Sequence, residues 1–239
     1  MMEANRKPSD GRIESIESFR TKDGNLLDIP AAKISGNLPL NCGHKEEKGM
    51  TLEPVLAFSH TLLAKAVKRG DIAIDATVGN GKDTEFLAEL VGKSGTVYGF
   101  DIQERAISRT KRLLAEKGLD HRVVLFQKGH ETILETLPEN LGGQVAGAIF
   151  NLGYLPKGDH SIITKPETTI PAVRQILSLL KPGGLMVLVI YQGHHGGERE
   201  RDCLLKFAKG LDQREFNVLK YQYINQKNAP PFLLAIEKR

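Results

Sequence analysis

Cysteine is scarce in this chain of 239 residues, which contains only Cys42 and Cys203. The two cysteines lie far apart and form no C-x-x-C pair, so the sequence predicts neither a disulfide framework nor a zinc knuckle. Cys42 and His44 alone are too few ligands for a metal site. We therefore expect no bound metal.

Long apolar runs are also missing. No segment approaches the length needed to cross a bilayer, and the N-terminus carries no apolar signal segment. These absences predict a protein that does not insert into a membrane.

A large excess of one charge is absent as well. The chain has 33 Lys and Arg against 29 Asp and Glu, a net charge of +4 and a pI near 9.0. This balance permits a nucleic-acid partner without establishing one. The 40% of hydrophobic residues are enough for one main domain with a substantial core.

Residues 1–48 differ from the rest in composition, because they mix charged residues with Ser, Gly, Asn and Pro and have few apolar positions. We expect an N-terminal extension that is partly disordered or draped on the core. Acidic residues interrupt it, unlike an intact organelle transit peptide, although a processed remnant remains an alternative. Residues 49–239 are expected to form the main domain.

From about residue 53 onwards, apolar strand patterns alternate with helical ones. This alternation predicts an α/β fold with a mostly parallel sheet and right-handed crossovers. No helix separates the last two strands, so we expect them to form an antiparallel hairpin at the sheet edge. The seven-stranded order resembles the Rossmann-like class I methyltransferases. We expect strands at 72–78, 96–101, 123–128, 145–151, 185–191, 216–224 and 231–238, helices at 54–70, 82–91, 103–117, 131–137, 168–180 and 198–209, and a KPGG turn at 181–184.

DATVGNGKDT, residues 75–84, joins an apolar strand to a glycine turn and the start of a helix. Gly79 and Gly81 permit close ligand approach, and the helix start offers free N–H groups. Thr84 stands where the dinucleotide fingerprint G-x-G-x-x-G needs its third glycine, which argues against NAD. Asp101 ends the next strand, at about the spacing at which a carboxylate reaches a ribose. These features favour S-adenosylmethionine, which has no phosphate; alternatively, the acids only cap loops and the glycines only form turns.

Ligands of open parallel sheets bind at the carboxyl ends of the strands, and polar residues or glycines follow five successive strands here. His130 is ambiguous, because a histidine at a strand–helix junction is often an N-cap or a solvent-facing residue. We expect cofactor contacts from Asp75, Thr77, Gly79, Asn80, Gly81, Asp83, Thr84, Asp101, Gln103, His130, Glu131 and Asn151.

The segment 151–169 is long for an α/β connection, and long loops at this edge commonly cover or select a substrate. Tyr154 can stack on a base while Lys157 and Lys165 meet phosphates; alternatively, Tyr154 anchors the loop and the lysines are solvent charges. His194 lies in QGHHGGERE, whose glycines indicate tight turns. We expect substrate contacts from Gly153, Tyr154, Lys157, Thr164, Lys165, Thr168, His194, Gly197 and Asn228.

Eight sequence blocks stand out beyond this patterning. They are FSHTLL (58–63), DATVGNGKDTEFLAELVG (75–92), YGFDIQ (98–103), GHE (129–131), FNLGYLPKGDHSIITKPETT (150–169), KPGG (181–184), GHHGG (193–197) and INQKNAPPFLLAIEK (224–238). Together they resemble the MnmM-type tRNA 5-aminomethyl-2-thiouridine methyltransferases, formerly described as rRNA methylases, over residues 54–239. The chain departs from that family in its N-terminal extension and at Ala229, where many members carry a second asparagine.

The resemblance implies methyl transfer from S-adenosylmethionine to the amine of 5-aminomethyl(-2-thio)uridine at the tRNA wobble position. It implies the tRNA anticodon stem-loop as partner and a cytoplasmic location, or a chloroplast or mitochondrion if the source is a plant. Whether the protein forms a homodimer stays open. We expect Asn151 to orient the amine, Tyr154 to pack on the uracil, and His194 to contact or deprotonate the substrate.

Three other functions remain as alternatives. The enzyme can methylate rRNA or a small amine, or the chain can be a noncatalytic RNA-binding protein that retains a methyltransferase fold. A dehydrogenase is disfavoured by Thr84.

Overall fold

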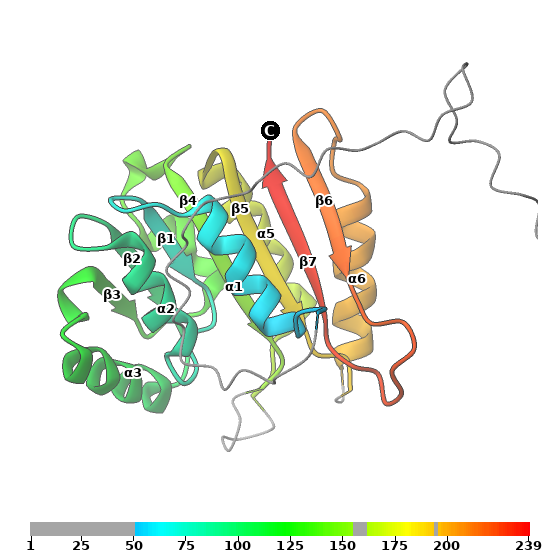
Figure 1. Ribbon diagram of the computed structural model, residues 1–239, viewed down its shortest axis with the longest axis horizontal. Helices are drawn as coiled ribbons and strands as arrows, with labels where there is room; N and C mark the ends of the chain where they lie inside the picture. Colours follow the sequence, from blue (N-terminus) through cyan, green and yellow to red (C-terminus); the bar gives the residue numbers. More distant parts are fainter. Residues whose placement is uncertain (1–50, 155–161, 194–195) are drawn as a thin grey trace, which may run out of the picture. The chain divides into compact units, whose positions relative to one another are not determined.

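A single mixed sheet forms the centre of the part of the chain that the structure describes. The computed structural model describes residues 51–154, 162–193 and 196–239. Seven strands pair in the order β3-β2-β1-β4-β5-β7-β6 (Figure 1). The first five strands along the chain run parallel, and β7 runs antiparallel to both β5 and β6, which confirms the predicted sheet and its terminal hairpin. The strands are β1 (Ile72–Asp75), β2 (Thr96–Phe100), β3 (Val123–Phe126), β4 (Val145–Leu152), β5 (Leu180–Ile190), β6 (Phe216–Tyr221) and β7 (Phe232–Lys238).

Helices cover both faces of this sheet (Figure 1). On one face, the first three helices pack with one cluster of buried apolar residues. On the other face, the last three pack with a second cluster. The helices are α1 (Val55–Ala66), α2 (Lys82–Val91), α3 (Glu104–Lys117), α4 (Ile133–Thr136), α5 (Pro166–Leu179) and α6 (Gly197–Lys209).

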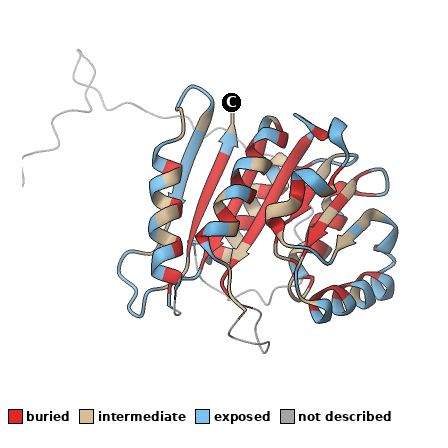
Figure 2. Cartoon of the chain, turned by 180° about the vertical axis from the view of Figure 1, so that it is seen from behind, coloured by how far each residue is buried: buried red, intermediate tan, exposed pale blue. Residues whose placement is uncertain are grey.

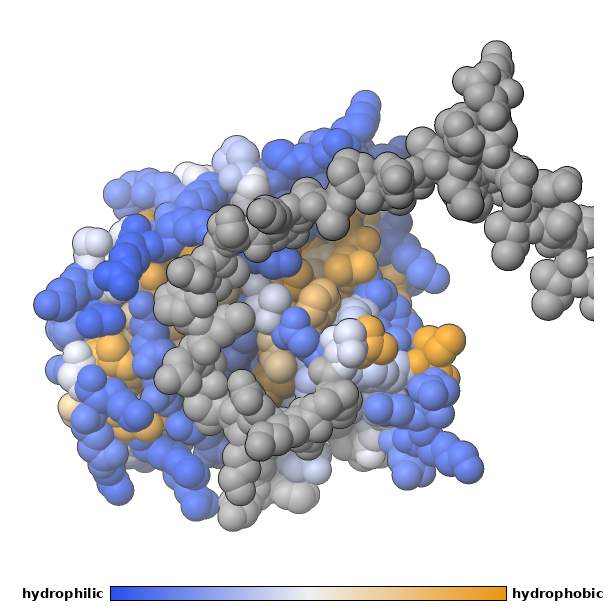
Figure 3. All heavy atoms as spheres, in the orientation of Figure 1, coloured by the Kyte–Doolittle hydropathy of each residue, from blue (hydrophilic) through white to orange (hydrophobic). Residues whose placement is uncertain are grey.

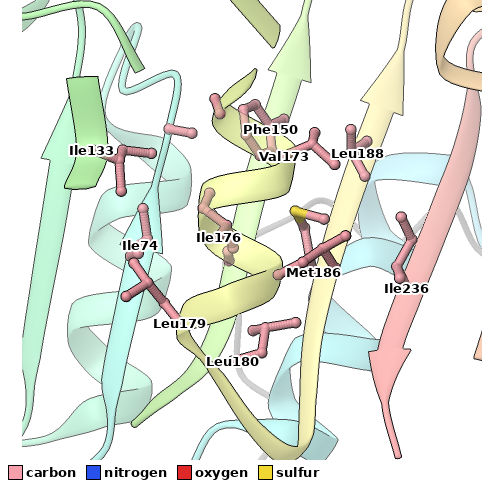
Figure 4. Packing of buried hydrophobic residues seen from close by; sticks show 14 of the residues in the cluster. Ile74, Ile133, Phe150, Val173, Ile176, Leu179, Leu180, Met186, Leu188 and Ile236 are labelled. Carbon is pink, nitrogen blue, oxygen red and sulfur yellow. The ribbon is translucent and has the colours of Figure 1, made fainter. Parts of the chain in front are cut away.

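The central strands are buried on both sides (Figure 2). In β5, Met186 and Leu188 contribute to the cluster beneath α5, whereas Val187 and Val189 contribute to the cluster beneath α1. Figure 4 shows Ile176 of α5 beside Met186, and Val173 of the same helix beside Leu188. Because apolar residues are needed on both faces, these strands read as continuous hydrophobic runs, which is typical of parallel sheets covered by helices.

The prediction of a turn at residues 181–184 is wrong. Strand β5 begins before it, at Leu180, which pairs with Val145. Leu185 then pairs with Gly147, so the glycine-containing segment bulges opposite Ala146 without leaving the strand.

Several element boundaries also differ from the prediction. Strand β1 ends at Asp75 rather than at residue 78, because the Asp75 carboxylate accepts the Thr77 N–H and turns the chain. Helix α5 begins at Pro166, in the first helical position where its missing N–H carries no penalty. The predicted helix 131–137 divides into a 3-10 turn, His130–Thr132, and α4.

A mostly apolar groove of about 310 Å³ lies beside α1, the helix in front of the sheet in Figure 1. It is lined by residues of α1 and of strands β5, β6 and β7, among them Leu62, Leu185 and Leu219. Figure 3 shows hydrophobic residues exposed between hydrophilic ones on this face.

Within the described part of the chain, no helix combines the length and apolar character required to cross a bilayer.

Candidate active site

A cavity of about 730 Å³ opens at the carboxyl ends of the parallel strands. Its walls come from the loops that follow β1 to β5, with Leu56 of α1 and Ala229 of the β6–β7 loop added. This is the edge at which open α/β sheets bind ligands, and the volume suits a small cofactor with part of a substrate. The lining includes these residues predicted from the sequence: Thr77, Gly79, Asn80, Asp83, Asp101, Gln103, His130, Glu131, Asn151, Gly153, Tyr154, Thr164, Lys165 and Thr168.

Other predicted residues do not line the cavity. Asp75, Gly81 and Thr84 are buried behind the glycine turn, and Gly197 and Asn228 do not belong to the wall. The predictions for Lys157 and His194, and for the extension 1–48, lie outside the described residues.

Asp75 stabilises the glycine turn from the buried side of the turn. Its side chain is fully buried, and its two oxygens accept the Thr77 N–H at 3.1 Å and the Thr84 hydroxyl at 2.5 Å. Removal from water, together with the nearby Asp83 charge, raises the pKa of Asp75 to about 7. The carboxyl therefore holds a proton in the folded protein over a pH range in which it is ionised in the unfolded chain.

This proton predicts a pH-dependent effect of Asp75→Asn on stability. Between about pH 4 and pH 7 the folded state binds more protons at this site than the unfolded state, so the wild-type contribution to stability falls as pH rises. The asparagine side chain does not ionise in this pH range. Its amide can donate to the Thr84 hydroxyl and accept from the Thr77 N–H. We compare the free energy of unfolding of the variant with that of wild type at about pH 5 and at about pH 8. Between these two pH values, we expect the difference to shift by about 2 kcal/mol in favour of the variant. Denaturant unfolding at both pH values measures this, and a difference that does not change with pH would contradict it.

Asp101 fixes the turn from the side. Its Oδ2 accepts the Gly79 N–H at 2.8 Å and its Oδ1 accepts the Gln103 N–H at 2.8 Å. Each carboxylate oxygen retains acceptor capacity for a further partner. In the same turn as Gly79, Gly81 has a φ of 80° and lies against Thr110. A Cβ added to Gly81 would be 2.6 Å from the Thr110 hydroxyl oxygen. A glycine is therefore required for this turn, which brings Asp101 and Gly79 together.

His130 presents a buried acceptor. Its Nδ1 lies 3.1 Å from the Ala76 carbonyl oxygen, which can only accept, so Nδ1 carries the hydrogen. Burial lowers the pKa of His130, so the ring is neutral near pH 7 and Nε2 keeps a free lone pair. Nε2 is buried and has no partner among the described residues. A ligand that donates an N–H would satisfy it.

Asn151, at the end of β4, occupies the opposite side of the glycine turn. Its backbone N–H donates to the Thr77 hydroxyl at 2.7 Å, and its side-chain amide donates to Asp83 of α2. Its Oδ1 is buried and has no partner among the described residues. Tyr191 at the end of β5 also lines the cavity, and desolvation with the nearby Asp83 charge raises its pKa, so its hydroxyl stays protonated.

The two ends of the long loop after β4 are held together. Tyr154 forms an antiparallel bridge with Ile163, and the Thr164 N–H donates to the Gly153 carbonyl at 2.9 Å. The Thr164 hydroxyl donates to the buried Glu200 of α6 at 2.7 Å. The loop thus returns to the cavity at a fixed place, while Tyr154 itself is 41% exposed at the rim.

Sequence reasoning missed several residues of this site. Leu56 lines the cavity, and His60 contacts Asp83 at 2.6 Å, although both belong to a helix that precedes the first strand. The FSHTLL block contains His60 and was the available signal. Ile102, which is 56% exposed, and Lys82 and Lys128 also line the cavity.

These features fit an adenosine cofactor without phosphate. Asp101 can accept from a ribose, His130 Nε2 can accept from an amine, and the exposed Ile102 offers an apolar surface to a base. The described residues contain no cluster of His, Cys, Asp and Glu able to hold a metal ion.

Comparisons with known proteins agree with this fit. The family model described as "Putative rRNA methylase" matches residues 97–237. The crystal structure of a "putative rRNA-methylase" from Clostridium thermocellum is 46% identical, with a TM-score of 0.76, covering 80% of this chain and all of that one. A "putative methyltransferase" from Streptococcus mutans in complex with SAH is 41% identical, with a TM-score of 0.71, covering 79% and 99% of the two chains.

A plant relative is also similar. It is the chloroplastic "tRNA (mnm(5)s(2)U34)-methyltransferase" of Arabidopsis thaliana, 38% identical over 188 residues, which are 75% of this chain and 68% of that protein. The sheet order, the cavity at the strand ends and these matches lead to one assignment. The chain belongs to the family described as "Putative rRNA methylase" and is a class I methyltransferase that depends on S-adenosylmethionine.

Proposed function

We propose that the protein methylates the amine of a 5-aminomethyl group on the wobble uridine of tRNA, giving the 5-methylaminomethyl form. The observation that carries this proposal is the buried Oδ1 of Asn151 beside the cavity, an acceptor without a partner among the described residues. An amine can donate an N–H to this oxygen and keep its lone pair for reaction. The 38% identity to a tRNA methyltransferase supports the choice of substrate.

We assign the cofactor to the part of the cavity formed by the glycine turn. Asp101 would bind the ribose, and the backbone at Gly79 and Asn80 allows close approach. His130 would accept from the amino group of the adenine, which would pack on Ile102. S-adenosylmethionine supplies a methyl group on a sulfonium whose sulfur leaves as a neutral thioether. The protein therefore contributes mainly alignment of donor and acceptor.

We assign the acceptor nucleoside to the part of the cavity formed by the ends of β4 and β5. Asn151 would orient the amine, which must be unprotonated because an ammonium has no lone pair. Tyr154 is exposed at the rim, where its ring can pack on the uracil. Lys165 is exposed nearby, and Lys82 and Lys128 also border the cavity, in places suited to RNA phosphates. Roles for Gly153, Thr168, Lys157 and His194 remain proposals from the sequence.

Analysis of modified nucleosides separates this proposal from its rivals. In tRNA from a strain lacking the gene, mass spectrometry should detect 5-aminomethyl uridines in place of the 5-methylaminomethyl forms. An intact tRNA mark together with a methyl group lost from rRNA would contradict the proposal and favour the rRNA alternative. Binding of S-adenosylmethionine without any loss of RNA methylation would favour a noncatalytic RNA-binding protein or a small-amine methyltransferase.

We also propose that residues 49–239 form the methyltransferase domain and that residues 1–48 form an extension to it. A cytoplasmic site of action, or an organelle in a plant, follows from the same substrate. Expressing residues 49–239 alone tests the boundary, because the fragment should bind S-adenosylmethionine as the full chain does.

A further inference from the structure

We propose that His60 and Asp83 form a positioning pair that fixes the side-chain amide of Asn151 with its oxygen, rather than its NH2 group, toward the amine acceptor. The inference rests on the proposed function, in which that oxygen accepts an N–H from the substrate. It adds two residues that act through Asn151 without touching the reacting atoms.

The carboxylate of Asp83 determines which way the amide of Asn151 points. An ionised carboxylate only accepts hydrogen bonds, so the Asn151 group bound to its Oδ2 is the NH2 group. The other end of the amide, Oδ1, is then left as the buried atom without a described partner. The backbone of Asn151 is held separately by the Thr77 hydroxyl, so only its two side-chain torsions remain to be fixed.

The ring of His60 holds Asp83 in place. Its Nε2 lies 2.6 Å from Asp83 Oδ1, the carboxylate oxygen that Asn151 does not use. The ring is 8% exposed and stacks on Phe86 at a centroid distance of 4.0 Å and an interplanar angle of 7°. Asp83 also lies in the first turn of α2, where the helix dipole favours a negative charge. The carboxylate is thus restrained from both sides.

Loss of this restraint would allow the amide to rotate by half a turn. The NH2 group would then face the amine and donate to its lone pair, which is the electron pair that must attack. With Oδ1 in that place, the amine donates instead and its lone pair stays available. The pair therefore favours the orientation that leaves the amine reactive.

Two substitutions at His60 separate hydrogen bonding from packing. His60→Phe keeps an aromatic ring against Phe86 but removes the donor to Asp83, whereas His60→Gln keeps an N–H donor and removes the stacked ring. We expect His60→Phe to lower kcat on undermodified tRNA about tenfold or more, with KM for tRNA and the Kd for S-adenosylmethionine within about threefold of wild type. We expect His60→Gln to keep kcat within about threefold of wild type.

A spectroscopic measurement tests the same pair without substrate. The side-chain amide signal of Asn151 in an NMR spectrum can be assigned by its loss in Asn151→Ala. We expect this signal to shift, and its protons to exchange faster, in His60→Phe but not in His60→Gln. An unchanged Asn151 signal or a wild-type kcat in His60→Phe would overturn the proposal, as would a His60→Gln variant as impaired as His60→Phe. If the wild-type protein fails to methylate tRNA, the proposed function fails instead, and the NMR comparison still decides whether the pair exists.

Discussion

Asn151→Ala is expected to lower kcat for tRNA methylation about 100-fold while leaving the Kd for S-adenosylmethionine within about threefold of wild type. The substitution removes the buried Oδ1 that we assign to the substrate amine, so the amine is no longer held in line with the methyl donor. Transfer of a labelled methyl group to undermodified tRNA measures kcat, and isothermal titration calorimetry measures cofactor binding.

Asn140→Ala is the matched control, because it makes the same change at an exposed position on the surface turn Glu139–Leu141. It should leave both quantities at their wild-type values. If Asn151→Ala kept a wild-type kcat, Asn151 would have no part in orienting the acceptor. A parallel loss of cofactor affinity would instead place Asn151 in the cofactor site.

Asp101→Ala is expected to weaken binding of S-adenosylmethionine about 10- to 100-fold, since the variant loses charge-assisted hydrogen bonds to a ribose. It also leaves the Gly79 and Gln103 N–H groups without their acceptor, which loosens the glycine turn. Calorimetry with the purified protein measures the change in Kd.

Two further variants, Asp101→Asn and Asp120→Ala, test whether the weaker binding of S-adenosylmethionine is specific to the Asp101 carboxylate. The amide in Asp101→Asn can still accept from one backbone N–H, so its Kd should lie between those of wild type and Asp101→Ala. Asp120 is exposed and does not line the cavity, so its replacement should change nothing. Unaltered affinity in Asp101→Ala would refute the ribose assignment.

The fold was predictable because its signals are local. Runs such as 145–150 are apolar throughout, since this part of β4 is buried on both faces, and the missing helix between the last two strands indicated the antiparallel hairpin. The segment Lys181–Gly184 was not predictable, because its proline and glycines are typical of a turn. Only the pairing of Leu180 with Val145 keeps it within β5.

Position in the cavity wall was predictable where a residue lies at the end of a strand, as Asn151 does, or directly after one, as Asp101 does. Sequence position could not tell which side a carboxylate faces: Asp75 turns inward to Thr77 and Thr84, so it supports the turn from beneath the cavity. His60 was missed because its contact with Asp83 spans 23 residues of chain and depends on how α1 packs over the sheet.

The central claim, methylation of a tRNA amine, is tested most directly with purified protein, S-adenosylmethionine and tRNA that carries unmethylated 5-aminomethyl uridine. After digestion to nucleosides, mass spectrometry should find that the 5-aminomethyl nucleoside has gained one methyl group, and that this gain requires the cofactor. An unchanged 5-aminomethyl nucleoside, in a preparation that binds S-adenosylmethionine, would contradict the account.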